Sequence, residues 1–127
     1  MAIRTELSLR LQNSPGAVAR VCQHLWGERV NILAFCIEGG GTLRLVVDNP
    51  LHASGLLQDN DYTVEQRDVL VVHLPSDAGS LENAARLLSN AGIGIDYAYG
   101  STVEDQGMAA IVFGVENAQR AATASGL

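Results

Sequence analysis

The apolar residues at the start of the chain change from a period of two to a period of about 3.6, which predicts a strand followed by a helix. Residues 3–11 alternate between a mainly apolar face and a polar face, as in a half-buried strand. After Pro15, apolar residues recur every three or four positions as far as Trp26, as on one face of a helix. Ser14 is predicted to cap this helix and Pro15 to occupy its first turn.

The remaining elements of the first 67 residues complete one supersecondary unit. Apolar segments at residues 31–38 and 42–48 are predicted to form a hairpin, because the three glycines between them tolerate the positive φ angles of tight turns. Asp48-Asn49-Pro50 opens a short second helix, and residues 62–66 form a fourth strand. The resulting order, βαββαβ, is that of a ferredoxin-like unit.

The second half of the chain repeats the first. Gly16 corresponds to Gly79 (79 − 16 = 63), and the apolar positions around these two glycines coincide, which indicates that one structural unit is used twice. The predicted elements of the second repeat are strands at 69–74, 93–101 and 108–115 and helices at 78–91 and 117–124. The offset grows to 68 at Glu116, which corresponds to Asp48, so the second hairpin is predicted to be five residues longer, in a connection that includes residues 104–107.

These elements predict an α/β (α+β) protein of two ferredoxin-like units, residues 1–67 and residues 68–127, with antiparallel sheets and helices on one face. The second repeat has no counterpart of the last strand of the first. Its first strand is therefore expected to border solvent, the first repeat or another molecule. Because an unpaired strand edge is a template for pairing, we expect a homodimer.

Composition and charge exclude several classes of partner. The 127 residues carry a net charge of −6, and the eight basic residues besides histidine are scattered arginines, so no basic stripe is available for nucleic acid. No apolar run approaches the roughly 18 residues that span a bilayer, and the start of the chain does not resemble a signal peptide. Cys22 and Cys36 lie within apolar patterns, as free thiols of intracellular proteins do. We therefore expect a cytoplasmic protein without a nucleic-acid or membrane partner.

Three short motifs occur in order along the first repeat. They are Asn13-Ser14-Pro15-Gly16-Ala17-Val18 before the first helix, Val30-Asn31-Ile32 at the second strand and Val47-Asp48-Asn49-Pro50 before the second helix. At these positions the repeat resembles an ACT domain, the amino-acid-sensing regulatory module, and the whole chain is similar to small tandem ACT proteins. The second repeat departs from the pattern, because Ser76-Asp77-Ala78-Gly79 lacks the proline and Gly94 stands in the place of Asn31.

The resemblance implies that a free amino acid binds between two ACT units. The loop before the first helix of one unit and the start of the second strand of its neighbour would hold it. The candidate ligand-binding residues are Asn13, Ser14, Pro15, Gly16, Ala17, Asn31, Ile32 and Leu33 in the first repeat, and Ser76, Asp77, Ala78, Gly79, Ile93, Gly94 and Ile95 in the second.

The chemistry of the loop suits such a ligand. Free N–H groups and the positive end of the helix dipole attract a carboxylate, and Gly16 lets the backbone approach the ligand closely. The Asn13 amide both donates and accepts hydrogen bonds, and the Asp77 carboxylate suits an ammonium group. The first loop keeps the asparagine and the proline of the pattern, so it is the place where we expect binding first.

Several of these residues also fit purely structural roles. Ser14, Pro15 and Asp77 suit the start of a helix, and Asn31 suits a helix end or a turn. These alternatives remain open on the sequence alone.

No sequence feature indicates catalysis, a cofactor or a metal. The three histidines have no metal-ligand spacing, and no serine or cysteine pairs with a base by position. Tyr97 and Tyr99 are predicted to share one strand face with Ile93 and Ile95 and to belong to a core or an interface. We therefore expect a binding protein and not an enzyme.

The expected function is that of an amino-acid-binding regulatory module. Its ligand would shift self-assembly or the binding of a partner, such as an enzyme of amino-acid metabolism. The alternative, from a different class, is a protein–protein scaffolding module that has lost ligand binding.

Overall fold

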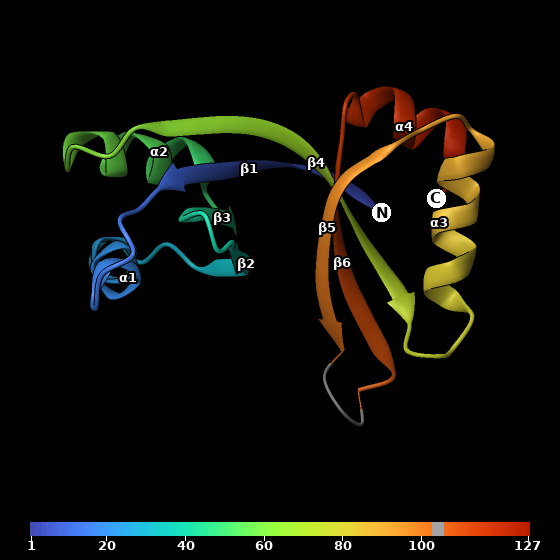
Figure 1. Cartoon of the computed structure of the whole chain (residues 1–127), viewed down its shortest axis with the longest axis horizontal. Helices are drawn as coiled ribbons and strands as arrows, with labels where there is room; N and C mark the ends of the chain where they lie inside the picture. Colours follow the sequence, from blue (N-terminus) through green and yellow to red (C-terminus); the bar gives the residue numbers. More distant parts are fainter. Residues whose placement is uncertain (103–105) are drawn as a thin grey trace. The chain divides into compact units, whose positions relative to one another are not determined.

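The computed structural model describes residues 1–102 and 106–127. The described elements are β1 (Ala2–Arg10), α1 (Ala17–Gly27), β2 (Ile32–Ile37), β3 (Thr42–Val47), α2 (Pro50–Asp59), β4 (Val64–Pro75), α3 (Ser80–Asn90), β5 (Ile95–Thr102), β6 (Met108–Val115) and α4 (Ala118–Ser125) (Figure 1). Six strands and four helices in this order confirm the predicted fold class. Glu104 and Asp105, in the connection that was predicted to be longer, lie outside the described residues.

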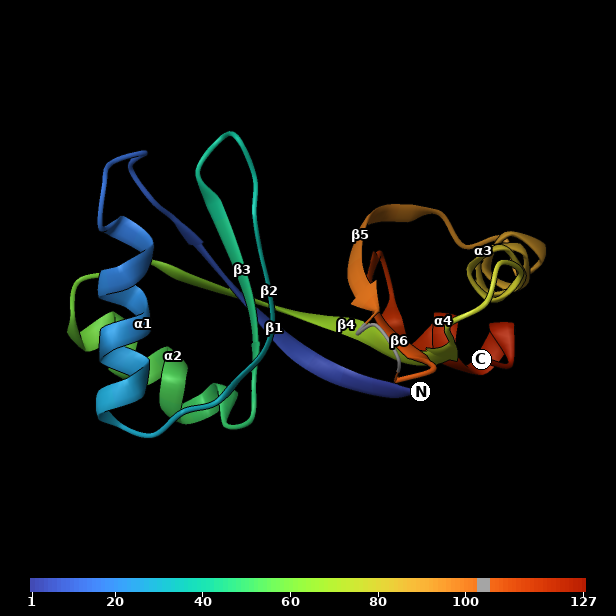
Figure 2. The same ribbon diagram turned by 90° about the horizontal axis from the view of Figure 1, so that it is seen from below.

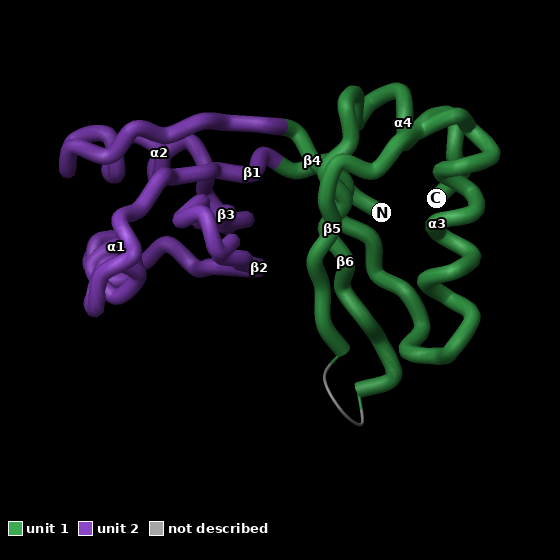
Figure 3. The backbone as a smooth tube through the Cα atoms, in the orientation of Figure 1, with its two compact units in different colours: residues 1–4, 68–127 green, residues 5–67 purple. Residues whose placement is uncertain are grey.

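The chain divides into two compact units. The N-terminal unit comprises residues 5–67, and the C-terminal unit comprises residues 68–127 together with residues 1–4 (purple and green in Figure 3). In each unit both helices lie on the same face of the strands (Figure 2). The strand order is β2-β3-β1-β4-β6-β5, so β1 and β4 each contribute residues to both units.

One strand replaces two of the predicted strands. The segments at 62–66 and 69–74 were expected to be separate, but β4 runs without a break from Val64 to Pro75. The polar residues 65–68 contain no glycine or proline that would end a strand, so the extended conformation continues through them. In the strand order β4 stands between β1 and β6, and the outer strands are β2 and β5.

The core of the N-terminal unit lies between its strands and its two helices. β1 pairs antiparallel with β3, which sets Leu7 opposite Leu45 and Leu9 opposite Leu43, all of them buried. The helices close the core with buried residues that recur at helical spacing. These are Val21 and Leu25 of α1 and Ala53 and Leu57 of α2.

The core of the C-terminal unit repeats this arrangement. β4 pairs antiparallel with β6, and Leu70 lies opposite Phe113, whose side chain is 1% exposed. Buried residues of both helices pack on this pair, as the repeat predicts. These are Ala84 and Leu88 of α3 and Ala118 and Ala121 of α4.

The second helix of each unit has an asparagine cap. The Asn49 side chain accepts a hydrogen bond from the His52 backbone N–H at 3.2 Å, and the Asn117 side chain accepts one from the Arg120 N–H at 2.9 Å. Each bond satisfies one of the donors that a helix start leaves unpaired, so the capping predicted at residues 48–50 is confirmed.

The first helix begins later than predicted. The expected roles of Ser14 as its cap and Pro15 as its first residue are wrong, since the N-cap is Gly16, with a φ of 86°, and the helix starts at Ala17. A positive φ lies outside the helical region, so the helix cannot extend back through Gly16.

A register shift occurs near the start of the second strand of each unit. It lies between Ile32 and Ala34 in β2 and between Ile95 and Tyr97 in β5. An extra residue in one strand moves the following side chains to the other face. The prediction that Tyr97 and Tyr99 share a face with Ile95 is therefore wrong.

Candidate functional site

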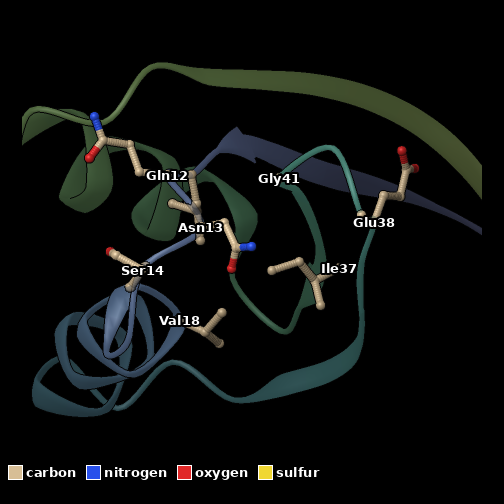
Figure 4. Close-up of a pocket in the computed structure, with 10 residues that line it drawn as sticks. Gln12, Asn13, Ser14, Val18, Ile37, Glu38 and Gly41 are labelled. Atoms are coloured by element: carbon tan, nitrogen blue, oxygen red, sulfur yellow. The ribbon is translucent and has the colours of Figure 1, made fainter.

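A cavity of about 240 Å³ lies at the start of α1 (Figure 4). It separates the loop that follows β1 from the hairpin that joins β2 to β3. Its lining comprises Leu11, Gln12, Asn13, Ser14, Ala17 and Val18 on the helix side and Ile37, Glu38, Gly39 and Gly41 on the hairpin side.

The hairpin is fixed to the loop by its last glycine. The Leu11 N–H donates to the Gly41 carbonyl at 2.8 Å, and the Gly41 N–H donates to the Glu38 carbonyl at 2.9 Å. Gly41 has a φ of 93°, and a Cβ atom there would lie 2.4 Å from the Leu11 carbonyl oxygen. Of Gly39, Gly40 and Gly41, only Gly41 has a positive φ. The sequence predicted positive φ angles for the turn as a whole, but the turn needs one at this single position.

Donors without partners gather at the loop. The first turn of α1 leaves the backbone N–H groups of Val18 and Ala19 without a hydrogen-bond partner among the described residues. The Asn13 amide also lacks one within the described chain, and Figure 4 shows Asn13, Val18 and Ile37 turned toward one another. The cavity therefore combines an amide and a helix N-terminus with an apolar wall.

The acidic residue at the rim is already engaged. The Glu38 carboxylate accepts a hydrogen bond from Arg44 Nε at 2.8 Å and points away from the cavity (Figure 4). Arg44 Nη1 also lies 3.3 Å from Glu6 Oε1, whose side chain is buried. Glu38 thus belongs to an ion-pair network of the strands, so the polar side chains in the cavity lining without an ion pair are those of Gln12, Asn13 and Ser14.

The corresponding loop of the C-terminal unit, Ser76, Asp77, Ala78 and Gly79, contains its own hydrogen bonds. Asp77 Oδ1 accepts the Gly79 N–H at 3.1 Å and the Ser80 hydroxyl at 2.7 Å. The N-cap of α3 is Gly79 and not Asp77. The Asp77 carboxylate nevertheless accepts hydrogen bonds from this N-cap residue and from Ser80, the first residue of the helix. The Asp77 carboxylate was predicted to hold an ammonium group, but its Oδ1 already accepts two hydrogen bonds from within the loop and the helix start.

Asp77 should titrate below its ordinary pKa. The hydrogen bond from Ser80, followed by that from the Gly79 N–H, lowers its pKa from 3.8. These bonds stabilise the fold above pH 3.8, and that contribution is lost as the pH falls through the folded-state pKa. Carboxyl-carbon NMR should show this pKa, and Ser80→Ala should raise it while Ser76→Ala leaves it unchanged. A wild-type Asp77 pKa at or above 3.8 contradicts the assignment.

The starts of the second strands lie away from the loop cavity. Asn31 precedes β2, whereas Ile37 ends it, and a strand of six residues spans about 17–20 Å. The Asn31 backbone N–H donates to Asp48 Oδ1 at 3.1 Å, and its Nδ2 donates to Oδ2 at 2.8 Å. Ile32 packs against the core and Leu33 is 52% exposed. The predicted residues of the loop before α1 and those at the start of β2 therefore do not line one cavity within the unit.

The same residues of the C-terminal unit also lie near the start of a strand. Ile93 packs against the core, Gly94 is exposed, and Ile95 is 40% exposed at the start of β5. Ile93 and Gly94 line a separate hollow with Glu116 and Arg120.

Sequence reasoning missed the apolar wall of the loop cavity. Leu11, Val18 and Ile37 line it, although only the loop and the residues after Val30 were expected to contact a ligand. A signal was present in the hairpin pattern, because a turn at residues 39–41 places Ile37 near the end of β1. Among the described residues no group of three histidine, cysteine or acidic side chains could hold a metal ion. None of the described helices is long and apolar enough to cross a membrane.

Solved structures of other proteins share this fold. Protein BT0572 from Bacteroides thetaiotaomicron is 29% identical over 96% of this chain and 85% of its own, with a TM-score of 0.88. The ligand-free regulatory subunit of aspartate kinase from Thermus thermophilus is 18% identical, with 98% and 92% covered and a TM-score of 0.72. E. coli aspartokinase III, in complex with lysine and aspartate, is 16% identical, with 99% and 31% covered and a TM-score of 0.61. No curated protein matches the sequence.

The family is established by the sequence itself. The profile of the ACT domain pair matches residues 1–124, which is nearly the whole chain. The two units, each with helices on one face of antiparallel strands, have the architecture that a pair of such domains requires. ACT domain pairs are regulatory modules, and this chain belongs to the ACT domain pair family.

Proposed function

We propose that the chain is a regulatory module that binds a free amino acid at the cavity beside α1. The observation that carries the proposal is the convergence of Asn13, Val18 and Ile37 on one cavity at a helix N-terminus (Figure 4). The membership of the ACT family supports it. The lysine and aspartate complex of the similarly folded E. coli aspartokinase III agrees with a ligand of this class.

The cavity offers a binding group for the carboxylate, the ammonium group and the side chain of an amino acid. The α-carboxylate accepts hydrogen bonds from the free N–H groups of Val18 and Ala19, where the helix dipole favours negative charge. The Asn13 carbonyl oxygen accepts from the α-ammonium group, since Glu38 is paired with Arg44. An apolar side chain packs against Ile37 and Val18.

The ligand acts by stabilising one assembly over another. In the proposed homodimer, the loop of one copy meets the start of a second strand of the other copy, which completes the wall. Binding then shifts the population toward the dimer or toward a complex with a partner enzyme, by the difference in affinity between the two states. A coupling of about 1–3 kcal/mol is typical of such a mechanism.

Asn13→Ala should weaken amino-acid binding while it leaves the fold intact. A thermal-shift screen of the twenty amino acids should give a concentration-dependent rise in Tm for one or a few, and about 2.7 kcal/mol of stabilisation at a ligand concentration 100 times the Kd. Loss of a hydrogen bond to a charged group should raise that Kd by about 10- to 100-fold in Asn13→Ala, because Asn13 is exposed and has no structural partner among the described residues.

Asn90→Ala is the matched control for this prediction, since Asn90 is also an exposed asparagine and lies at the end of α3 in the other unit. It should bind as the wild type does. A ligand whose Kd is the same in both variants would show that the cavity is not its site. A screen without any rise in Tm for the wild-type dimer would contradict the proposed function altogether.

The exposed edge of β2 favours the scaffolding role as a second candidate. Leu33, Phe35 and Ile37 are each about half exposed, at 52%, 62% and 48%, on an outer strand. A strand edge with apolar side chains is suited to pairing with another protein. If no amino acid raises the Tm and a partner still binds at β2, this second function is the correct one.

A further inference from the structure

A second cavity of the N-terminal unit shares part of the loop before α1 with the first but has a different lining. Its volume is about 220 Å³. Pockets for drug-sized ligands measure roughly 300–1,000 Å³, so this cavity suits a smaller molecule. Its polar side chains can all donate hydrogen bonds, and none of the described residues in the lining is acidic. These side chains are Arg10, Gln12, Ser14, Arg20 and Tyr62.

Two arginines bring positive charge to this cavity. Arg10 ends β1, and Arg20 lies near the start of α1. Both are exposed, and neither has an ion pair or a hydrogen bond with any residue in the described ranges. Arg20 Nη1 lies 3.6 Å from the position that a Cβ atom at Gly16 would take, so its guanidinium lies beside the N-cap of α1. Within a chain of net charge −6, these two cations therefore remain available to an anion from solution.

The start of α1 is an unfavourable place for a cation. The positive end of the helix dipole lies there, and it repels the Arg20 guanidinium. The first turn of α1 contains no acidic residue that would offset this repulsion, whereas the first turn of α3 contains Glu82. An anion beside Arg20 is therefore attracted both by the guanidinium and by the helix end.

The C-terminal unit carries an anion of its own at the equivalent place. By the repeat, Ser14 corresponds to Asp77 (77 − 14 = 63), and Arg20 corresponds to Asn83 (83 − 20 = 63). The Asp77 carboxylate accepts two hydrogen bonds at the start of α3. One unit thus combines a carboxylate with a neutral asparagine, and the other combines a neutral serine with an arginine. The N-terminal unit has the cation but lacks the built-in anion.

The remaining donors surround the same space. The Tyr62 ring packs edge-on against His24 of α1, with centroids 6.0 Å apart and planes at 73°, and its other contacts are with the core. The ring is therefore fixed, while its hydroxyl has no hydrogen-bond partner within the described part of the chain. The side chains of Gln12 and Ser14 are turned away from Asn13, which faces the first cavity (Figure 4).

We propose that this cavity binds a small phosphate dianion, either inorganic phosphate or the phosphate group of a phosphomonoester. The two guanidinium groups balance its two charges and present planar sets of N–H donors that match phosphate oxygens. The hydroxyls of Ser14 and Tyr62 and the amide of Gln12 donate further hydrogen bonds. A zwitterionic amino acid is not the ligand here, because no described residue of the lining offers a carboxylate to its ammonium group.

Titration of the full chain with sodium phosphate, glycerol 3-phosphate and succinate tests the site, with sodium chloride added to keep the ionic strength constant. Phosphate or glycerol 3-phosphate should bind and should shift the amide NMR signals of Gly16 and Ala17. The stronger of these two ligands identifies the source as free or esterified phosphate. Succinate carries two negative charges on separate carboxylates, so it should bind at least about tenfold more weakly.

Arg10→Gln and Arg20→Gln should each raise the Kd for the stronger phosphate ligand by about 10- to 100-fold, because each removes hydrogen bonds to a charged group. Two other exposed arginines provide the matched controls. Arg4→Gln alters the opposite end of β1, and Arg86→Gln alters α3. Both control variants should bind phosphate as the wild type does.

Ser14→Asp tests the comparison between the two units. It places a carboxylate in the lining at the position equivalent to Asp77. The new charge interacts favourably with the arginines and the helix dipole, so the Tm without phosphate should rise. The same charge repels a phosphate, so binding should be lost. Phosphate binding that persists in Ser14→Asp would contradict the assignment.

Other outcomes would also overturn the inference. These are unchanged phosphate binding in both Arg10→Gln and Arg20→Gln, an equal loss in the two control variants, and succinate binding as tight as that of the phosphates. A wild-type chain that binds neither phosphate nor glycerol 3-phosphate would do so as well. Each of these results leaves the proposed amino-acid binding standing, because that function is tested separately by Asn13→Ala at the first cavity.

Discussion

Phe113→Ala should destabilise the fold by about 3–5 kcal/mol, which is much of the 5–15 kcal/mol that holds an ordinary domain folded. The ring is 1% exposed and lies opposite Leu70 in the centre of the core of the C-terminal unit. Removing it leaves a cavity that its neighbours cannot fill, because Leu88 and the alanines of α4 are held by their own packing. Urea denaturation followed by circular dichroism measures the loss.

Phe35→Ala is the matched control, since Phe35 is the other phenylalanine of the chain and is 62% exposed on β2. Its truncation should change the free energy of unfolding by no more than about 0.5 kcal/mol. Equal losses in the two variants would show that Phe113 does not form the centre of a packed core. A large loss in Phe35→Ala alone would show that β2 is covered in solution.

Gly41→Val should have the second largest effect, because it changes both stability and the loop cavity. A side chain at a φ of 93° is strained by about 1–3 kcal/mol. Its Cβ atom would also lie 2.4 Å from the Leu11 carbonyl oxygen, so the hairpin must move away from β1. We expect a total loss of about 3 kcal/mol or more, and weaker amino-acid binding at the cavity that Gly41 lines. Thermal unfolding with and without ligand measures both effects.

Gly39→Val and Gly40→Val provide the comparison for this prediction. Neither glycine has a positive φ, and a Cβ atom at either meets no atom within 4 Å. Both variants should retain nearly the stability of the wild type. If all three substitutions cost the same, the hairpin would not be fixed by the contact between Gly41 and Leu11.

The fold could be predicted because periodicity and repetition are strong signals. Leu7 and Leu9 alternate with polar residues, and Val21 and Leu25 recur at helical spacing, so strand and helix were separable from sequence. The offset between Gly16 and Gly79 then extended one βαββαβ unit to the whole chain. The cap of α2 followed from Asn49 before the helix, which is a local and specific feature, whereas Asn117 was expected to begin α4 and is its cap.

The errors arose where three-dimensional contacts decide the backbone. Pro15 and Ser14 suited a helix start, but the positive φ of Gly16 delays the helix to Ala17. The register shift before Tyr97 depends on how β5 pairs with β6, which no local pattern specifies. The continuity of β4 across the repeats likewise depends on its neighbours in the sheet.

The loop cavity was only half predictable. Asn13 belongs to a recognisable motif in the loop, and the structure places its side chain in the cavity (Figure 4). Ile37 comes from the far side of a hairpin, so its part in the wall follows from strand pairing.

The membership of residues 1–4 in the C-terminal unit has a consequence for the order of folding. These residues lie more than 60 positions from residue 68, the next residue of that unit, whereas residues 5–67 form a contiguous unit. Bringing distant segments together costs loop-closure entropy, and chains with such non-local pairing fold more slowly. We therefore expect the N-terminal unit to form faster than the complete C-terminal unit. Once it has closed the intervening loop, the first residues of β1 can join the C-terminal unit at little further entropic cost.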